Sequence, residues 1–291
     1  MKAILRLTIA EQIRRKTFAV FGAVTALYLV LWGVLLYNYM GSSVLADSAM
    51  VEAGGGQVEP LTSMLMLQMS LQFSSSLICL LAIMTGAGMI SSDVDSGVVL
   101  GIMARPIARR SYVLGRFGGV LVLVAAFATA LYALVLALGA AFSLSTVTSL
   151  GAGQLMRGWL LYVSVPAAIL CLTAFGSTVF KTVANGVVMV FFYILGNVGG
   201  MVETIGMYLD DANVNAAGVF ISLVSPFHTL FGAAERSLLP SAGIAGDVAA
   251  ASSGLSGGGQ PSAWMYLYIA VYVSAFLALA VRRFARRDIT A

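Results

Sequence analysis

The charged residues that could take part in chemistry or binding are concentrated in one short stretch of a very apolar chain. Residues 91–116 read SSDVDSGVVLGIMARPIARRSYVLGR, and the runs on either side are long and almost free of charge. The stretch carries two of the twelve acidic and four of the sixteen basic residues: Asp93, Asp95, Arg105, Arg109, Arg110 and Arg116. Such side chains can bind lipid headgroups or a protein partner, and no nucleophile–histidine–acid set accompanies them in the sequence.

The spacing within this stretch predicts a short helix. Ser92, followed three residues later by Asp95, fits a capping box, and acidic residues suit the positive end of the helix dipole. Apolar residues then recur every four positions, at Val94, Val98 and Ile102. Pro106 disfavours helical geometry in the residue before it, so we expect a helix of about three turns.

The composition of the chain is that of a membrane protein. Of its 291 residues, 60% are hydrophobic and 10% are charged, with a mean hydropathy of +0.96. Soluble domains carry about 25% charged residues. We expect a single membrane domain over residues 1–291. Cys79 and Cys171 form no ligand cluster and His228 is the one histidine, so we expect no metal site.

Apolar runs that are long enough to cross a bilayer and hold at most one charged residue occur six times. A transmembrane helix needs about 20 mostly apolar residues, and barrel strands would instead alternate over about 10 residues. The sequence therefore predicts an all-α membrane protein with six transmembrane helices, at about 18–40, 62–90, 113–144, 158–180, 184–207 and 263–281.

The basic residues predict the orientation of these spans. With the N-terminus in the cytoplasm, the outside holds only Arg157 and Arg236, and the C-terminus is also cytoplasmic. The inside segments then hold 14 of the 16 basic residues: Lys2, Arg6, Arg14, Arg15, Lys16, Arg105, Arg109, Arg110, Arg116, Lys181, Arg282, Arg283, Arg286 and Arg287. This orientation places residues 91–112 in a cytoplasmic loop. One interpretation is a loop whose arginines hold headgroups, but an apolar ridge at that surface favours a protein partner.

Two segments outside the spans are also predicted to be helical. In residues 1–16, Leu5, Ile9 and Ile13 recur every four positions, which suits an amphipathic helix lying in the interface; a basic flank that sets topology is the alternative. Residues 212–234 are uncharged, but as a seventh span they would move the basic tail outside. We expect a re-entrant or interfacial helix there, within an outer loop 208–262, with a buried loop segment as the alternative.

Polar side chains within the spans are candidates for a translocation path. In the second span they follow one helical face, at Gln68, Gln72, Ser75 and Ser76. They either line a transport cavity or form hydrogen bonds between helices. In the fifth span, the small residues of GNVGGMVE favour a helix contact, at a dimer axis among other places. There Asn197 and Glu203 are further path candidates, and an interface anchor is the alternative for Glu203.

The charged stretch resembles a known family. An acid, Gly97, a hydrophobic stretch, RPIARR and the pair Gly115–Arg116 are similar to the first cytoplasmic loop of type-2 ABC exporter permeases. This sequence departs from that pattern where Val98 replaces threonine, Ala108 replaces serine and Arg116 replaces lysine. The six spans, the N-terminal helix and the segment before the last span also resemble the family plan.

The resemblance implies that residues 91–112 form a coupling helix, which docks on a separate ATP-binding subunit. It implies that Asp93, Asp95, Gly97 and Val98 form or position the docking surface. Arg105, Arg109 and Arg110 would bind headgroups or the ATPase, and Lys181, in the short loop 177–185, would add a smaller contact.

The resemblance also implies a transport subunit rather than an enzyme, in a bacterial plasma membrane. The sequence contains no GxxxxGK[ST] motif, so we expect ATP and Mg in the partner and no cofactor in this chain. Six spans form half of a transport path, so a homodimer or a heterodimer with a related permease is expected, among membrane lipids and without nucleic acid. The alternatives are a self-sufficient secondary transporter or channel, and a non-transporting assembly factor. The cargo stays open.

Overall fold

The computed structural model describes residues 2–50, 58–103, 108–209, 211–238 and 263–286. Within these residues the regular structure is helical, without a strand. Six helices are long and apolar enough to cross a membrane, which confirms the predicted all-α architecture. These spans are formed by the long helices α2 (Lys16–Met50), α3 (Val58–Ala87), α6 (Arg109–Ala141), α8 (Ala152–Val179), α9 (Thr182–Tyr208) and α13 (Ala263–Arg286). In a bilayer such apolar runs must satisfy their own backbone hydrogen bonds, and the helix does so within each segment.

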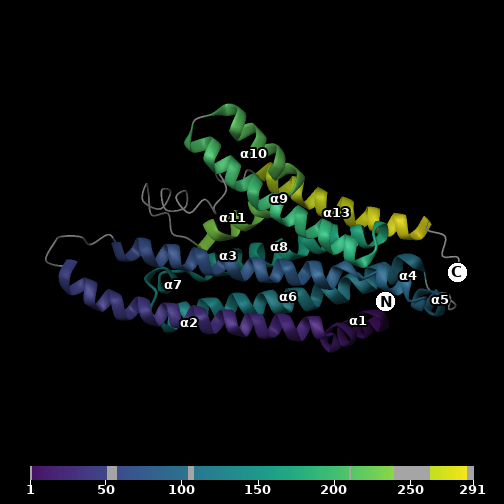
Figure 1. Cartoon of the computed structure of the whole chain (residues 1–291), viewed down its shortest axis with the longest axis horizontal. Coiled ribbons are helices and arrows are strands. Elements are labelled where there is room, and N and C mark those ends of the chain that lie inside the picture. Colours follow the sequence, from purple (N-terminus) through teal and green to yellow (C-terminus); the bar gives the residue numbers. More distant parts are fainter. Residues whose placement is uncertain (1, 51–57, 104–107, 210, 239–262, 287–291) are drawn as a thin grey trace.

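Shorter helices lie at the two ends of the bundle and beside its long helices (Figure 1). They are α1 (Lys2–Arg14), α4 (Ser91–Asp95), α5 (Val98–Met103), α7 (Ser145–Thr148), α10 (Ala212–Val224) and α11 (Phe227–Leu238). We call the end that carries α1, α4, α5 and the last turns of α13 the terminal end. The opposite end, where α7 lies, is the far end.

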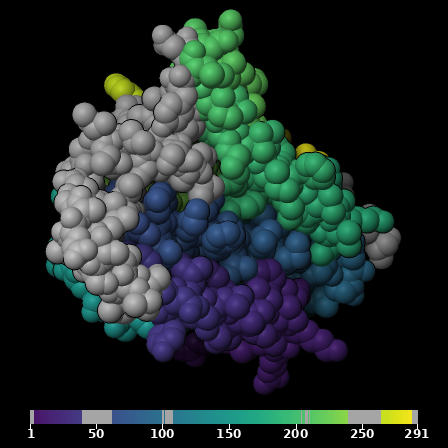
Figure 2. Space-filling model, turned by 60° about the vertical axis from the view of Figure 1, so that its left-hand side comes forward, coloured from purple at the N-terminus to yellow at the C-terminus, as the bar shows by residue number. Residues whose placement is uncertain are grey.

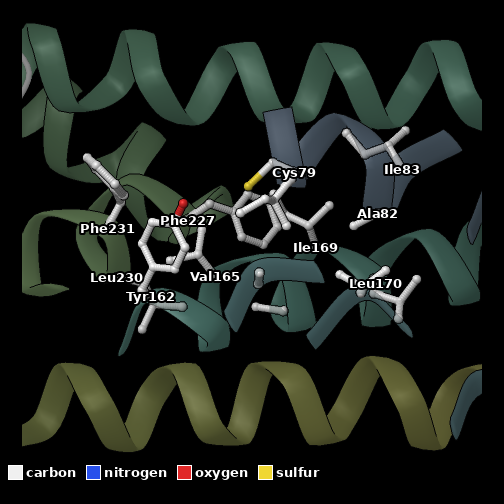
Figure 3. Packing of buried hydrophobic residues seen from close by; sticks show 14 of the residues in the cluster. Cys79, Ala82, Ile83, Tyr162, Val165, Ile169, Leu170, Phe227, Leu230 and Phe231 are labelled. Atoms are coloured by element: carbon white, nitrogen blue, oxygen red, sulfur yellow. The ribbon is translucent and has the colours of Figure 1, made fainter. Parts of the chain in front are cut away.

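The centre of the bundle is formed by α3 and α8. Their most apolar windows are 72% and 67% buried, whereas those of α2 and α13 are 17% and 11% buried. Figure 3 shows the packing between them, where Cys79 and Ile83 of α3 meet Val165 and Ile169 of α8. On the face shown in Figure 2, α3 lies between α2 and α9. The outer helices therefore present apolar surface that suits lipid or other membrane helices.

The segment before the last span is a bent helix pair. The axes of α10 and α11 meet at 97°, with Ser225 and Pro226 between them. Proline lacks a backbone N–H, which favours a break here. Two tyrosines of α13 satisfy the last carbonyls of α10, since Tyr268 donates to Leu223 O at 2.7 Å and Tyr272 to Val224 O at 2.9 Å. The predicted helical segment at 212–234 is thus present, and the break between α10 and α11 is stabilised by hydrogen bonds from α13.

Glycines of α9 let this pair approach closely. A Cβ at Gly199 would lie 2.6 Å from the side chain of Ile221, and a Cβ at Gly196 or Gly200 would lie even closer to Ser225 or His228. The helix contact predicted for this glycine-rich part of the fifth span is therefore made within the chain, against α10 and the start of α11.

Candidate functional site

The charged stretch of the sequence lies at the terminal end, directly after α3. The single helix predicted from Ser92 onward is wrong, because the chain forms α4 and α5 with a break between them. Gly97 has φ +71°, a left-handed conformation that glycine adopts without strain and that ends α4. The predicted capping box is also absent: the N-cap is Ile90, without a side-chain cap, and Ser92 donates to Gly88 O instead.

Asp93 lies at the base of this segment, facing the bundle. Its carboxylate accepts hydrogen bonds from Tyr112 and Arg116, both on α6. All three residues are buried, and Arg116 is only 4% exposed. A buried carboxylate is stabilised by such charged and hydroxyl donors. Asp93 therefore fixes α4 against α6 and does not belong to the exposed surface of the segment.

Arg116 also holds the N-terminal helix. Its guanidinium contacts Glu11 of α1 at 2.5 Å, and Glu11 also pairs with Arg15 at 2.6 Å. Burial alone raises the pKa of Glu11, but hydrogen bonds and charge attraction from Arg116 and Arg15 outweigh it, so this pKa lies below its usual 4.5. Nearby, a Cβ at Gly119 would lie 2.7 Å from Thr8, so α1 packs tightly on α6.

The start of α9 holds the other side of the segment. Ser91 and Thr182 share a hydrogen bond of 2.8 Å between their hydroxyls. Asn185 is fully buried and donates to the carbonyls of Ala87 and Thr173, each at 3.0 Å. These bonds join the end of α3 to α8 and α9. Asn185 was not identified from the sequence, although an asparagine beside a short loop between two spans is a visible signal.

The last turns of α13 complete the terminal end. Arg109 donates to Ala285 O at 3.2 Å, and the rings of Tyr112 and Phe284 stack with centroids 5.6 Å apart. The segment α4–α5 is thus connected, through buried contacts at its base, to α1, α6, α9 and α13.

The outer surface of the segment carries the remaining predicted residues. Asp95, Ser96 and Gly101 are exposed, Val98 is 49% exposed and Gly97 is half-buried. Nearby, Arg110 and Lys181 are exposed and Arg109 is half-buried. Arg105 lies outside the described residues. Exposed acidic, small and apolar groups on a rigidly held base suit a docking surface for a protein.

The polar residues predicted within the spans join α3 to α9. Gln72 donates to Asn197 at 3.4 Å, Asn197 donates to Tyr193 O at 2.9 Å, and Tyr193 donates to Ser76 at 2.8 Å. Ser75 is buried within α3. Two of these bonds, Gln72 to Asn197 and Tyr193 to Ser76, join α3 to α9, as in one of the two interpretations of the pattern, and the third lies within α9.

The two remaining path candidates lie nearer the far end. Gln68 is buried on α3. Glu203 is half-buried on α9 and accepts from Ser222 of α10 at 3.1 Å. Among the described residues, no three of the types His, Cys, Asp and Glu are grouped to hold a metal ion.

Comparison with families of known proteins gives a match over most of the chain. The family described as ABC-2 family transporter protein matches residues 3–289, which is nearly the whole chain. A comparison with curated proteins found no match. The matched range includes the α4–α5 segment, the helices that hold its base and the bent pair α10–α11.

Proposed function

The chain belongs to the ABC-2 family of transporter proteins, as a multi-pass membrane permease subunit, and we propose that it forms the path of an ATP-driven exporter. In this proposal a separate ATP-binding subunit docks on the α4–α5 segment and supplies ATP and Mg. The terminal end faces the cytoplasm, and this is supported by the sequence segments assigned to the inside, which hold 14 of the 16 basic residues. The membrane is then the plasma membrane.

The observation that carries the proposal is the contrast between the tip and the base of α4–α5. The tip presents Asp95, Ser96 and Val98 to solvent. The base is held by a buried ion pair between Asp93 and Arg116. A segment that only connected two spans would need no such anchorage, whereas a segment that receives a force must not slip against the helices it moves.

The contacts at the base support a route for that force. Arg116 belongs to α6 and holds α1 through Glu11, while Ser91 bonds to Thr182 at the start of α9. A displacement of α4 therefore acts on several long helices together. Rigid elements joined by packed and hydrogen-bonded contacts are the physical means by which such coupling travels.

The transport path itself is proposed to follow α3 and α9. Gln68, Gln72, Ser75 and Ser76 of α3, with Asn197 and Glu203 of α9, would line it when these helices separate. Six spans form half of a path, so two copies, or this chain with a related permease, would enclose it.

Copurification tests the docking proposal. The chain, expressed in its native cells and purified in mild detergent, should retain an ATPase with a Walker motif. Gly101→Arg should release that ATPase, because Gly101 is exposed on α5 with open space around it. Asp95→Lys, which reverses an exposed charge on the tip, should also weaken retention.

Gly153→Arg is the matched control, since Gly153 is equally exposed and unobstructed but lies in α8 at the far end. It should leave the ATPase bound. Retention of the ATPase by all three variants, or solute movement by the purified chain alone, would contradict the proposal.

A further inference from the structure

The interface between α3 and α11 contains buried polar atoms that the described residues leave without partners. Both ring nitrogens of His228, both carboxylate oxygens of Glu235 and the amide oxygen of Gln72 have no hydrogen-bond partner there. His228 is 4% exposed and Glu235 is 1% exposed. Buried polar groups in proteins are normally paired, because an unpaired group loses its hydration without compensation. A concentration of such atoms in one place is therefore a sign of a missing ligand.

These side chains come from three helices that contact one another, α3, α9 and α11. The Gln68 side chain of α3 lies beside Glu235 of α11, and Gln72 lies one helical turn further along α3. Gln72 bonds to Asn197 of α9, and one turn beyond Asn197 the backbone of Gly200 lies against the ring of His228. We call this group the α3–α11 seam: Gln68, Gln72, Asn197, His228 and Glu235.

The seam is built on the bent pair. α11 begins directly after the break at Ser225 and Pro226, and it runs from the middle of the bundle toward the far end (Figure 1). Its other faces pack on α8, where Leu230 and Phe231 lie in the apolar core (Figure 3). α11 is a short helix, and the break at Ser225 and Pro226 already interrupts its backbone hydrogen bonds with α10, so it can move away from α3 without unfolding a full span.

The unpaired atoms favour a cation. Glu235 brings two acceptor oxygens and a full negative charge when ionised, and Gln72 brings a further acceptor oxygen. An anion would be repelled by Glu235. A hard metal ion needs about six oxygen ligands, and the seam has too few. Arg236, the next residue on α11, is half-buried and attracts the Glu235 carboxylate by its charge.

We propose that the α3–α11 seam is a subsite for the ammonium or guanidinium group of an organic cation, with Glu235 as its anionic contact and Gln72 as a hydrogen-bond acceptor. The statement that the bound cation is cargo rests on the proposed transport function. The existence of the subsite does not depend on that function.

Charge-selective labelling tests the proposal. Gln72→Cys is introduced into a chain with Cys79→Ala and Cys171→Ala, in native membranes that contain the ATPase. Labelling rates are measured with 2-aminoethyl and 2-sulfonatoethyl methanethiosulfonate, each divided by its rate with a free thiol. We expect the ammonium reagent to react at least tenfold faster than the sulfonate. Glu235→Gln should reduce that preference to about that of the free thiol.

Two controls make the result specific. Asp211→Asn makes the same kind of change, from a carboxylate to an amide, at the exposed N-cap of α10 outside the seam, and should leave the preference intact. If Gln72→Cys does not fold, Ser75→Cys serves as a second reporter on α3, because cysteine differs little in shape from serine. Absence of labelling at both positions, or a preference that Glu235→Gln does not alter, overturns the subsite. A cation preference that persists with no effect of ATP keeps the subsite and counts against ATP-driven transport instead.

Discussion

Buried acidic side chains have different partners at the terminal end of the bundle and in the α3–α11 seam. At the terminal end, Asp93 is paired with Arg116 and Tyr112, and Arg116 is shared with Glu11. In the α3–α11 seam, Glu235 is at least as deeply buried, but neither of its oxygens makes a well-formed hydrogen bond among the described residues, and its neighbours are the neutral side chain of Gln68 and the charge of Arg236. Paired buried charges hold helices in one arrangement, whereas unpaired ones make the closed interface costly. The difference indicates a rigid joint at one end and an interface made to open at the other.

Loss of Arg116 should have the largest effect on the joint. Arg116→Met leaves Asp93 and Glu11 as carboxylates without their shared cation, and breaking a buried pair in this way costs about 3 to 5 kcal/mol. Thermal unfolding in detergent should show a marked fall in Tm. Arg110→Met removes an exposed cation from the first turn of the same helix and should change the Tm little. An equal change in Tm for the two variants would contradict a stabilising role for the buried contacts of Arg116.

The same chemical change at the two buried acids should then give different results. Asp93→Asn removes the charge that Arg116 needs and should lower the free energy of unfolding by about 2 kcal/mol, as expected for a charged hydrogen bond. Glu235→Gln replaces an unpaired acid with a neutral group of the same shape, so stability should stay within about 0.5 kcal/mol or rise. Denaturant unfolding of both variants measures this directly. If Glu235→Gln is the more destabilising change, the contrast between joint and seam is wrong.

Removal of the tyrosine hydroxyls that hold the break should have a smaller effect. Tyr268→Phe and Tyr272→Phe each remove one bond to the end of α10. Hydrogen bonds between membrane helices contribute about 0.6 kcal/mol on average. Each variant should therefore lower stability by about that amount, measured by the same unfolding. Tyr266→Phe serves as the control on α13, and it should leave stability unchanged if the loss of stability comes from the hydrogen bonds to α10.

The smallest expected effect is the pH dependence of the contact between α1 and α6. Because the pKa of Glu11 is lowered in the folded chain, its contribution to stability is fully present above 4.5 and is lost as pH falls below 4.5 through the folded pKa. Glu11→Gln should therefore be less stable than wild type at pH 7, and the gap should close in acid. A gap that stays constant from pH 7 to pH 3 would mean that the charge of Glu11 contributes nothing.

The spans and their approximate ends could be predicted from the sequence, because an apolar run of about 20 residues rarely forms anything other than a transmembrane helix. The break in the charged stretch could not. Gly97 is compatible with a helix or with the left-handed conformation, and the contacts of Asp93 with α6 decide between them. Arg116 lies at the start of the predicted third span, and nothing local indicates that it pairs with residues 23 and 105 positions away.

The seam was missed for a different reason. The uncharged segment 212–234 ends one residue before Glu235, so this acid was counted with the outer loop. Its spacing of seven from His228 places both on one face of α11, and that signal was visible in the sequence. Its meaning depended on Gln68 and Gln72, more than 150 positions earlier, which only the packing of α11 on α3 brings near.

Photo-crosslinking from the tip of α4–α5 tests the central claim most directly. A benzoylphenylalanine is placed at Val98, which is 49% exposed, and in a second sample at Met156, which is 63% exposed in α8 at the far end. After irradiation of native membranes, we expect the Val98 sample to form an adduct that contains a Walker-motif ATPase and the Met156 sample to form none. An adduct from Val98 without an ATPase, or the same ATPase captured equally from Met156, would contradict docking on this segment.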